Sequence, residues 1–475
     1  MTIEQKIMLR GSALAVLAVL NAPAQALQKP KTMEEMWKII EAQQKQIDDM
    51  KATVAESAKN PPAPPQGNVK TLERKTDILS QEVEKLRTNL VIPEETKYKS
   101  QYGLGPAASK VYQVGKGLSI GGYGEANYQA TVGDEKTIAA GSANGKKDNA
   151  DFERLVLYAG YKFTDRILFN SEIEFEHGST ENGGSVSVEF ASLDFFIHKL
   201  ANARAGMVLL PMGFINQIHE PPFYFGNNRP EVERQIIPST WREIGAGLFG
   251  ELAPNLTYTT YVVNGLNAAN FTSDGIRSGR QKGSQAKAED LAFVGRVDYA
   301  PSVLPGLSVG GSAYFGNSGQ NQLFNGQQVD AFTQLYEGHV QWKYRGLEFR
   351  ALGSWGHIDD ADVLSAHNLV TKNGKGVIGE DNYGWYAEVG YDVLPWLVRD
   401  TTQYLAPFFR YEKFDTIASA PTGFLDNDSK DRRIYQVGLQ YKPIPNVVLK
   451  ADYRNFMSKF GDLPDDFNLG VGFIF

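Results

Sequence analysis

The carboxyl-terminal ten residues, 466–475, place an apolar side chain at every second position. The series begins at Phe467 and ends on the terminal residue, Phe475. Successive side chains of a strand point to opposite faces, so this spacing predicts a strand with one apolar face. A strand that shows lipid an apolar face and ends the chain on an aromatic residue is typical of the closing strand of an outer-membrane barrel. We therefore expect an all-β transmembrane antiparallel barrel in a Gram-negative outer membrane.

The amino terminus predicts export. Lys6 and Arg10 precede the short apolar run 11–20, and Ala24 and Ala26 supply a small-x-small cleavage site. These features indicate a signal peptide over residues 1–26. Its apolar core is too short to span a bilayer as a helix, and no other stretch approaches the roughly 20 apolar residues required. A membrane-inserted chain of this kind must cross as strands.

Composition permits a barrel but does not decide for one. The chain has 42% hydrophobic residues, 47 glycines, 22 tyrosines and 26 phenylalanines, which suits aromatic girdles and glycine-rich turns, and also a soluble secreted β-protein. It has no cysteine, which excludes disulfides, thiolate metal sites and cysteine nucleophiles. The formal charge of -7 is mild and argues against a nucleic-acid partner.

Residues 27–100 predict a separate periplasmic coiled-coil module. Two segments with apolar residues at alternating spacings of three and four flank a proline-rich spacer at residues 60–67. The alternative is a pair of amphipathic helices that pack on the barrel or plug it. Residues 101–116 are expected to be a linker. The residues of the two apolar seams are Met33, Met36, Ile40, Gln43, Ile47, Met50 and Val54, then Val69, Leu72, Thr76, Leu79, Val83, Leu86 and Leu90.

From residue 117 to 475 the pattern predicts a barrel of about 16 strands. Connections after odd-numbered strands are mostly long and those after even-numbered strands are mostly tight, as in bacterial barrels with external loops and periplasmic turns. An even strand count puts both ends of the barrel in the periplasm. The predicted strands are 118–130, 152–163, 167–177, 186–199, 203–210, 242–252, 255–264, 290–300, 307–316, 332–344, 347–357, 383–394, 404–414, 432–442, 447–456 and 467–475.

Five motifs in this region carry a family resemblance. They are residues 117–124, residues 204–214, residues 242–245, residues 407–412, and Tyr441-Lys442-Pro443 with residues 446–450. In this order they resemble the phosphate-selective porin O and P family. The resemblance implies a trimer of sixteen-stranded barrels whose pore is narrowed by an inward-folded third external loop. Family members that prefer phosphate line the pore with a ladder of arginines and lysines.

The predicted inward faces mix both signs of charge. A ring of one sign selects ions of the other, whereas interleaved signs mainly orient dipolar solutes. The equally weighted alternative is a water-filled lumen whose charges are solvated or paired for structure. The inward bases are Arg154, Lys162, Arg296, Lys343, Arg350, Arg410, Lys450 and Arg454, and the inward acids are Glu172, Glu174, Glu176, Asp298, Glu337, Glu348, Glu388, Asp392, Glu412 and Asp452.

The third external loop, residues 211–241, is the candidate constriction. Its prolines limit the entropy cost of folding inward, and its aromatic cluster at 223–225 is suited to anchoring it on the barrel wall. Arg229 and Arg234 are expected to form an anion filter with Arg242, which Glu231 and Glu233 dilute. The alternative is a loop packed over the barrel mouth or against a neighbouring subunit. The pore-lining candidates are thus Arg154, Lys162, Arg229, Glu231, Glu233, Arg234, Arg242, Arg296, Arg350, Arg410, Glu412, Lys450 and Arg454.

These expectations favour a porin for passive diffusion of small hydrophilic solutes or ions, including phosphate or other anions. A structural anchor that tethers the membrane to the cell wall is the alternative, and a barrel enzyme is a weaker one, since the six histidines show no metal-ligand spacing. No cofactor or metal is expected. The expected partners are the lipid bilayer, lipopolysaccharide, the solutes, further copies of the chain, and peptidoglycan. For the copies, the barrel favours a homotrimer, whereas the second coiled-coil segment favours a dimer.

Overall fold

A computed structural model of the protein describes residues 99–133, 147–181, 183–460 and 463–475, together with Glu41, Lys45 and Asp48. Those three residues are helical and exposed. The predicted signal peptide and the rest of the predicted coiled-coil module lie outside the described residues. The chain divides into one unit of residues 1–96 and a second of residues 97–475. No helix among the described residues is long and apolar enough to cross a membrane.

The second unit is a closed barrel of sixteen strands, each antiparallel to its neighbours, which confirms the predicted fold class. An added two-stranded hairpin, β10–β11, lies outside the barrel sheet. The barrel strands are β1 (Gly117–Val132), β2 (Asn149–Lys162), β3 (Ile167–Glu176), β4 (Ser185–His198), β5 (Ala201–Leu209), β6 (Arg242–Ala253), β7 (Leu256–Asn264), β8 (Leu291–Tyr299), β9 (Leu307–Gly316), β12 (Thr333–Tyr344), β13 (Leu347–Ile358), β14 (Asp381–Tyr391), β15 (Tyr404–Ser419), β16 (Asp431–Ile444), β17 (Val447–Ser458) and β18 (Asp465–Ile474).

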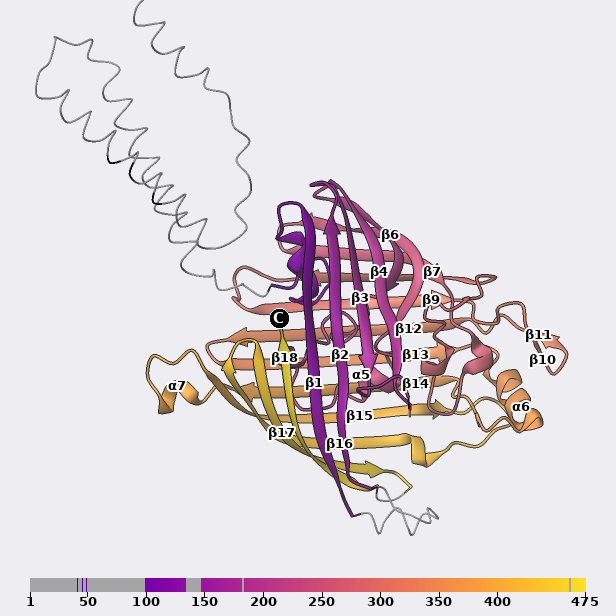
Figure 1. Ribbon diagram of the computed structural model, residues 1–475. Coiled ribbons are helices and arrows are strands. Elements are labelled where there is room, and N and C mark those ends of the chain that lie inside the picture. The colour runs from indigo at the N-terminus through magenta and orange to yellow at the C-terminus, as the bar shows by residue number, and fades with distance from the viewer. Residues whose placement is uncertain are drawn as a thin grey trace, which may run out of the picture. The chain divides into compact units, whose positions relative to one another are not determined.

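The remaining elements are short and lie in the connections. They are η1 (Ala108–Tyr112), η2 (Pro221–Phe223), α5 (Val232–Gln235), η3 (Ala268–Asn270), η4 (Arg277–Gly279), β10 (Leu323–Phe324), β11 (Gln327–Gln328), α6 (Ala361–Thr371), α7 (Leu394–Leu397) and η5 (Asp428–Lys430). Connections after β1, β5, β7, β9 and β13 are long, and those after β4, β6, β12 and β16 are two-residue turns. Figure 1 shows α6 and the β10–β11 hairpin at one end of the barrel and α7 at the other.

The first and last strands close the barrel, as predicted from the carboxyl terminus. The pairing of β1 with β18 runs from Tyr123 opposite Ile474 to Val132 opposite Asp465. The terminal residue extends the ladder, because Phe475 N donates to Gly122 O at 2.9 Å and Phe475 O accepts from Gly122 N at 3.0 Å. β1 and β18 lie side by side in Figure 1.

The two faces of the wall have opposite polarity. On β18, Phe467, Leu469 and Val471 are exposed to the surroundings, whereas Asp466 and Asn468 are buried inside. The same inversion recurs around the barrel, where outward residues are aliphatic or aromatic and buried inward residues are largely charged or amide side chains. A wall that is apolar outside and polar inside is stable when lipid surrounds it. The fold is therefore that of an outer-membrane barrel.

Candidate functional site in the barrel interior

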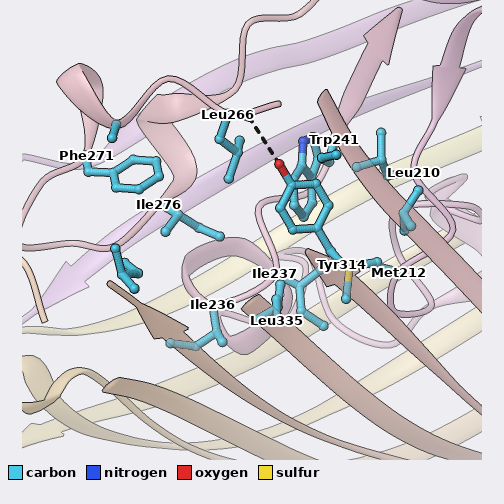
Figure 2. Packing of buried hydrophobic residues seen from close by; sticks show 14 of the residues in the cluster. Leu210, Met212, Ile236, Ile237, Trp241, Leu266, Phe271, Ile276, Tyr314 and Leu335 are labelled. Carbon is cyan, nitrogen blue, oxygen red and sulfur yellow. Dashed lines mark hydrogen bonds between the residues drawn. The ribbon is translucent and has the colours of Figure 1, made fainter. Parts of the chain in front are cut away.

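The third external loop, which we call L3 (residues 210–241), folds into the barrel. Its apolar residues Leu210, Met212, Ile236, Ile237 and Trp241 are buried in one hydrophobic core. Figure 2 shows that this core also takes residues from the fourth external loop, L4 (residues 265–290), and from the wall strands β9 and β12. Within this core the hydroxyl of the wall residue Tyr314 accepts a hydrogen bond from Leu266 N at 3.1 Å. This core fixes the two loops to each other and to the wall at the external end.

Four of the wall bases predicted as pore-lining residues donate to backbone carbonyls of L3. Lys450 Nζ donates to Tyr224 O at 3.0 Å and Gly226 O at 2.8 Å, and Arg350 donates to Phe223 O at 3.0 Å. Arg410 donates to Phe225 O at 2.7 Å, and Arg296 to Gly213 O. Among the described residues these five carbonyls accept no backbone hydrogen bond, so each of these contacts satisfies an acceptor of the loop. These bases hold L3 in place.

The aromatic residues of L3 add to this anchoring, as its sequence predicts. Phe225 stacks on Phe408 of β15, with ring centroids 5.0 Å apart. Tyr224 donates to Glu125 of β1 at 2.8 Å, and Lys450 lies over the Tyr224 ring. L3 therefore reaches strands on well-separated parts of the wall, which places it across the lumen.

Carboxylates of the same wall strands, and one of L3 itself, also secure the loop. Glu412 of β15 accepts from Val232 N at 3.0 Å, and Asp452 of β17 accepts from Asn227 N at 2.8 Å. Glu233 accepts from Phe214 N and Ile215 N, both at 2.7 Å, and is fully buried. Glu233 therefore accepts hydrogen bonds from N–H groups of its own loop. It does not face a passage.

L3 and L4 bring together a group of basic residues, which we call the L3–L4 basic cluster: Arg229, Arg234, Arg242, Arg277, Arg280 and Lys282. Arg277 donates to Arg234 O at 3.2 Å, and Arg280 donates to Pro238 O at 3.1 Å. These bonds hold the L4 guanidinium groups against L3. Within the described part of the chain, the buried Nε and Nη2 atoms of Arg229 have no hydrogen-bond partner.

The electrostatics of the two loops reflect crowding of like charge. Burial, and then the charge of Arg280, lower the pKa of Arg277 to about 9. Burial, and then Arg242, lower the pKa of Arg280 to about 10, and the pKa of the exposed Lys282 is lowered in the same way. Arginine stays charged at neutral pH, so the cations repel one another. A small anion bound near Arg277 and Arg280 would relieve that repulsion.

Acids offset part of this charge. Arg234 is half-exposed and pairs with Glu231 at 3.1 Å, and Glu231 also reaches Arg454 at 3.6 Å. Arg242 pairs with Glu189 at 2.7 Å. The mixture of charges predicted from the sequence is thus present, and buried guanidinium nitrogens without a hydrogen-bond partner among the described residues occur at Arg242 and Arg350 of the wall as well as at Arg229 of L3.

The other predicted candidates lie in pairs on the wall. Arg154 pairs with Glu125 at 2.9 Å and Glu174 at 3.4 Å. Arg454 donates twice to Asp466, at 2.8 and 2.6 Å. Lys162, at the periplasmic end of β2, donates to Val114 O at 3.1 Å. The structure therefore places Arg234 near Arg277 and Arg242 near Arg280, puts Arg229 between these groups and Arg154 of β2, and distributes the remaining candidates around the lumen.

Residues 101–112, which we call the lumen segment, also lie in the interior. Leu104, Ala107, Ala108 and Val111 are buried against the wall and against L3. The sequence predicts only a linker here, because nothing in its local pattern shows what it packs on. The start of this segment, at Gln101 to Gly103, lines a cavity of about 860 Å³ together with residues of β4 to β8, Gln217 of L3, and Asp165 and Arg166 of the turn between β2 and β3. This cavity lies at the end of the barrel that carries the short turns, and we call it the vestibule.

Four further basic residues of the interior escaped prediction. Arg277, Arg280 and Lys282 lie in a loop with no periodicity, so only their basic character was available as a signal. Arg204 lies inward on β5 and donates to Asp194 at 2.6 and 2.8 Å. Its inward position follows from the same alternation that identified the other wall bases, so it was accessible to sequence analysis.

The closed sixteen-stranded wall, the inverted polarity and the infolded loop together define a porin-type outer-membrane barrel. An uncharacterized protein of Aquifex aeolicus (strain VF5) is 39% identical over 378 residues, covering 78% of this chain and 82% of that protein. The chain belongs to the same family as this protein. No model of a known protein family matches the chain.

Solved structures with similar folds include three barrels. OmpF of Salmonella typhi in complex with daunomycin is 13% identical, covers 76% of this chain and 98% of its own, and has a TM-score of 0.48. The outer membrane channel DcaP of Acinetobacter baumannii is 13% identical, with coverages of 75% and 97% and a TM-score of 0.47. The anion-selective porin from Comamonas acidovorans is 10% identical, with coverages of 75% and 99% and a TM-score of 0.48.

Proposed function

We propose that the protein is an outer-membrane channel for passive diffusion of small hydrophilic solutes, with a preference for anions that the L3–L4 basic cluster provides. The observation that carries the proposal is a polar barrel interior narrowed by an infolded loop, on which Arg229 has buried donors without partners. Unpaired cations at the narrowest part of a pore attract anions and repel cations. The wall bases Arg350, Arg410 and Lys450 serve mainly to position L3 in this proposal.

Reversal potentials across planar bilayers test the proposal. In a gradient of KCl, wild-type channels are expected to favour chloride weakly. Changing Arg229, Arg234 and Lys282 together to Gln removes three positive charges and is expected to shift the reversal potential towards potassium. L3 should stay in place, because among the described residues no hydrogen bond or ion pair of these three side chains anchors it to the wall. The Arg399→Gln variant is the matched control, since Arg399 is an exposed base in a periplasmic connection.

The salt dependence of this shift is a second readout. Screening shortens the reach of exposed charges from about 10 Å at 0.1 M to about 3 Å at 1 M salt. The difference between the triple variant and wild type should therefore shrink as salt rises. An unchanged reversal potential in the triple variant would contradict the assignment of anion preference to this cluster.

Phosphate is the anion that the family resemblance suggests. Phosphate offers several acceptor oxygens to guanidinium donors, which suits the unpaired atoms of Arg229. Block of the chloride current by micromolar phosphate would support a phosphate-selective channel, and its absence would favour a general anion preference.

A structural anchor is the alternative function, favoured by the length of the unit formed by residues 1–96. An anchor without a channel gives no conductance, so the same bilayer recordings distinguish the two.

We also propose a homotrimer in contact with lipopolysaccharide, and a periplasmic amino-terminal module that reaches peptidoglycan. Mass measurement of the detergent complex tests the trimer, and co-sedimentation with purified peptidoglycan tests the last contact.

A further inference from the structure

We propose that the lumen segment, residues 101–112, is a gate: it occludes the β1–β5 side of the lumen at rest and opens it by withdrawing towards the periplasm. The proposal rests on the proposed channel function. Three properties of the segment carry it: its seat on the wall, its contact with L3, and its independence from the barrel sheet.

The seat on the wall is made of specific polar contacts. Asn170 of β3 donates to Ala108 O at 2.9 Å, and the hydroxyl of Tyr112 donates to Asp194 of β4 at 2.8 Å. Arg204 of β5 then clamps both ends of the segment, because it donates to Tyr112 Oη at 3.0 Å and to Tyr102 O at 3.2 Å. The segment is thus held by a buried network in one defined position.

Glycines in the wall leave room for this seat. Gly160 of β2 faces inward, and a Cβ atom there would lie 2.7 Å from Val111 Cβ. Gly121 of β1 also faces inward, and a Cβ atom there would lie 2.9 Å from Ala107 O. A larger residue at either position would force the segment to shift slightly within its seat, so the wall is shaped to receive it.

The segment also contacts the constriction loop directly. Glu220 of L3 accepts from Ala107 N at 2.9 Å and from Ala108 N at 3.4 Å. Gly105 of the segment also packs closely on Glu220, since a Cβ atom on Gly105 would lie 2.7 Å from the Glu220 carboxyl carbon. Movement of the segment therefore removes a contact that positions L3.

The barrel does not depend on the segment for its closure. All sixteen strands pair without it, and the segment's backbone–backbone hydrogen bonds, among the described residues, are internal to residues 101–113. Every contact with the wall or L3 runs through a side chain. Withdrawal would therefore break side-chain contacts and leave the sheet intact.

Space and connectivity favour movement towards the periplasm. The segment begins at the vestibule of about 860 Å³, which lies in its path. The unit formed by residues 1–96 precedes it directly in the chain. A displacement of that unit would pull on the segment through the peptide chain. Such a pull would withdraw the segment from its seat in the lumen.

An engineered disulfide tests the gate in the full-length protein. The chain has no cysteine, so Val111→Cys with Gly160→Cys introduces the only thiols. Disulfides need Cβ atoms about 3.5–4.5 Å apart, so the segment must shift by about 1 Å to form this one. Lys110→Cys with Gly121→Cys is the second pair, because a Cβ atom on Gly121 would lie 3.1 Å from Lys110 Cδ. Val111→Ser with Gly160→Ser is the matched control, since it adds the same Cβ atom to the wall without the cross-link. Gel mobility with and without reductant reports whether each disulfide has formed.

We expect the oxidised, cross-linked protein to lose the large conductance steps of wild type, and reductant to restore them. Wild-type conductance from a protein whose disulfide has formed would overturn the gate but leave the channel function standing. Failure of both pairs to cross-link in folded protein would overturn the seat itself. Absence of conductance in wild type, reduced variants and the serine control would remove the channel function, and the gate with it.

Discussion

At the scale of single residues, the interior charges divide by what they bind. A buried guanidinium has five donors, and each must find an acceptor or cost free energy. Arg410 places its donors on Glu388, Gln436 and two L3 carbonyls, so its charge is used to fix the loop. Arg229, in contrast, keeps buried donors without partners in the described part of the chain. Two arginines of the same interior, one on the wall and one on L3, thus take different roles.

Changing Arg410 to Gln should destabilise the protein strongly. The substitution leaves Glu388 buried without its main cation and frees the carbonyls of Phe225 and Asn228. Removing one partner of a buried pair costs about 3–5 kcal/mol. The thermal unfolding midpoint in detergent should therefore fall well below wild type. Arg433→Gln, which removes an exposed guanidinium from β16, should leave it nearly unchanged. Equal midpoints for the two variants would show that Arg410 does not anchor L3.

Glu220 should make stability depend on pH. Burial raises the pKa of this L3 carboxyl to about 8 from an ordinary value of 4.5, with Glu172 and Tyr158 facing it from the wall and His219 beside it. Between pH 4.5 and pH 8, the folded protein therefore keeps a proton on Glu220 that the unfolded chain has lost. Stability should fall as pH rises from about 4.5 to 8 and then level off. The Glu220→Gln variant should show a smaller fall in unfolding midpoint over that range, and an identical fall would contradict the assignment.

At the scale of elements, strands were predictable and loop positions were not. The period of two is strong because one face meets lipid and the other meets polar contents, so predicted strand 307–316 matches β9 at both ends. Predicted strand 404–414 stops five residues short of the end of β15, where no apolar pattern continues. The path of L3 depends on contacts with strands that are distant in sequence, such as β15 and β17. No local period encodes those contacts.

Changing Phe475 to Asp should impair insertion far more than changing Phe460 to Asp. The Phe475 ring occupies the space beside Gly122 of β1, where a Cβ atom would lie 2.6 Å from it, so the aromatic ring covers the seam of the barrel. Phe460 is 82% exposed in an external loop and controls for the chemistry of the substitution. Outer-membrane levels measured by fractionation report the outcome. Equal levels for the two Phe variants would contradict the closing role of Phe475.

At the scale of the whole molecule, the sequence predicted the architecture and left the contents of the lumen open. Closure, strand number and sidedness follow from alternation and connection length, which act over the entire chain. The roles of interior charges follow from which groups meet across the lumen, and those pairs join residues such as Glu220 and Ala107, more than 100 positions apart. Contacts between residues so distant in sequence are determined by the folded barrel. The sequence therefore yields the residue types of the site but not their partners.

The predicted coiled coil of residues 27–100 supplies the last test. The exposed helical residues Glu41, Lys45 and Asp48 all lie outside its predicted apolar seam, whereas Ile47 lies within it. Seam residues of a coiled coil face the partner helix, so single cysteines there approach their counterparts in other subunits. In the otherwise cysteine-free, full-length protein, Ile47→Cys should form interchain disulfides efficiently, and Asp48→Cys should not. Non-reducing gels of outer membranes measure both. Equal cross-linking at the two positions, or none at either, would remove the coiled coil as the means of self-association and leave the barrel wall to provide it.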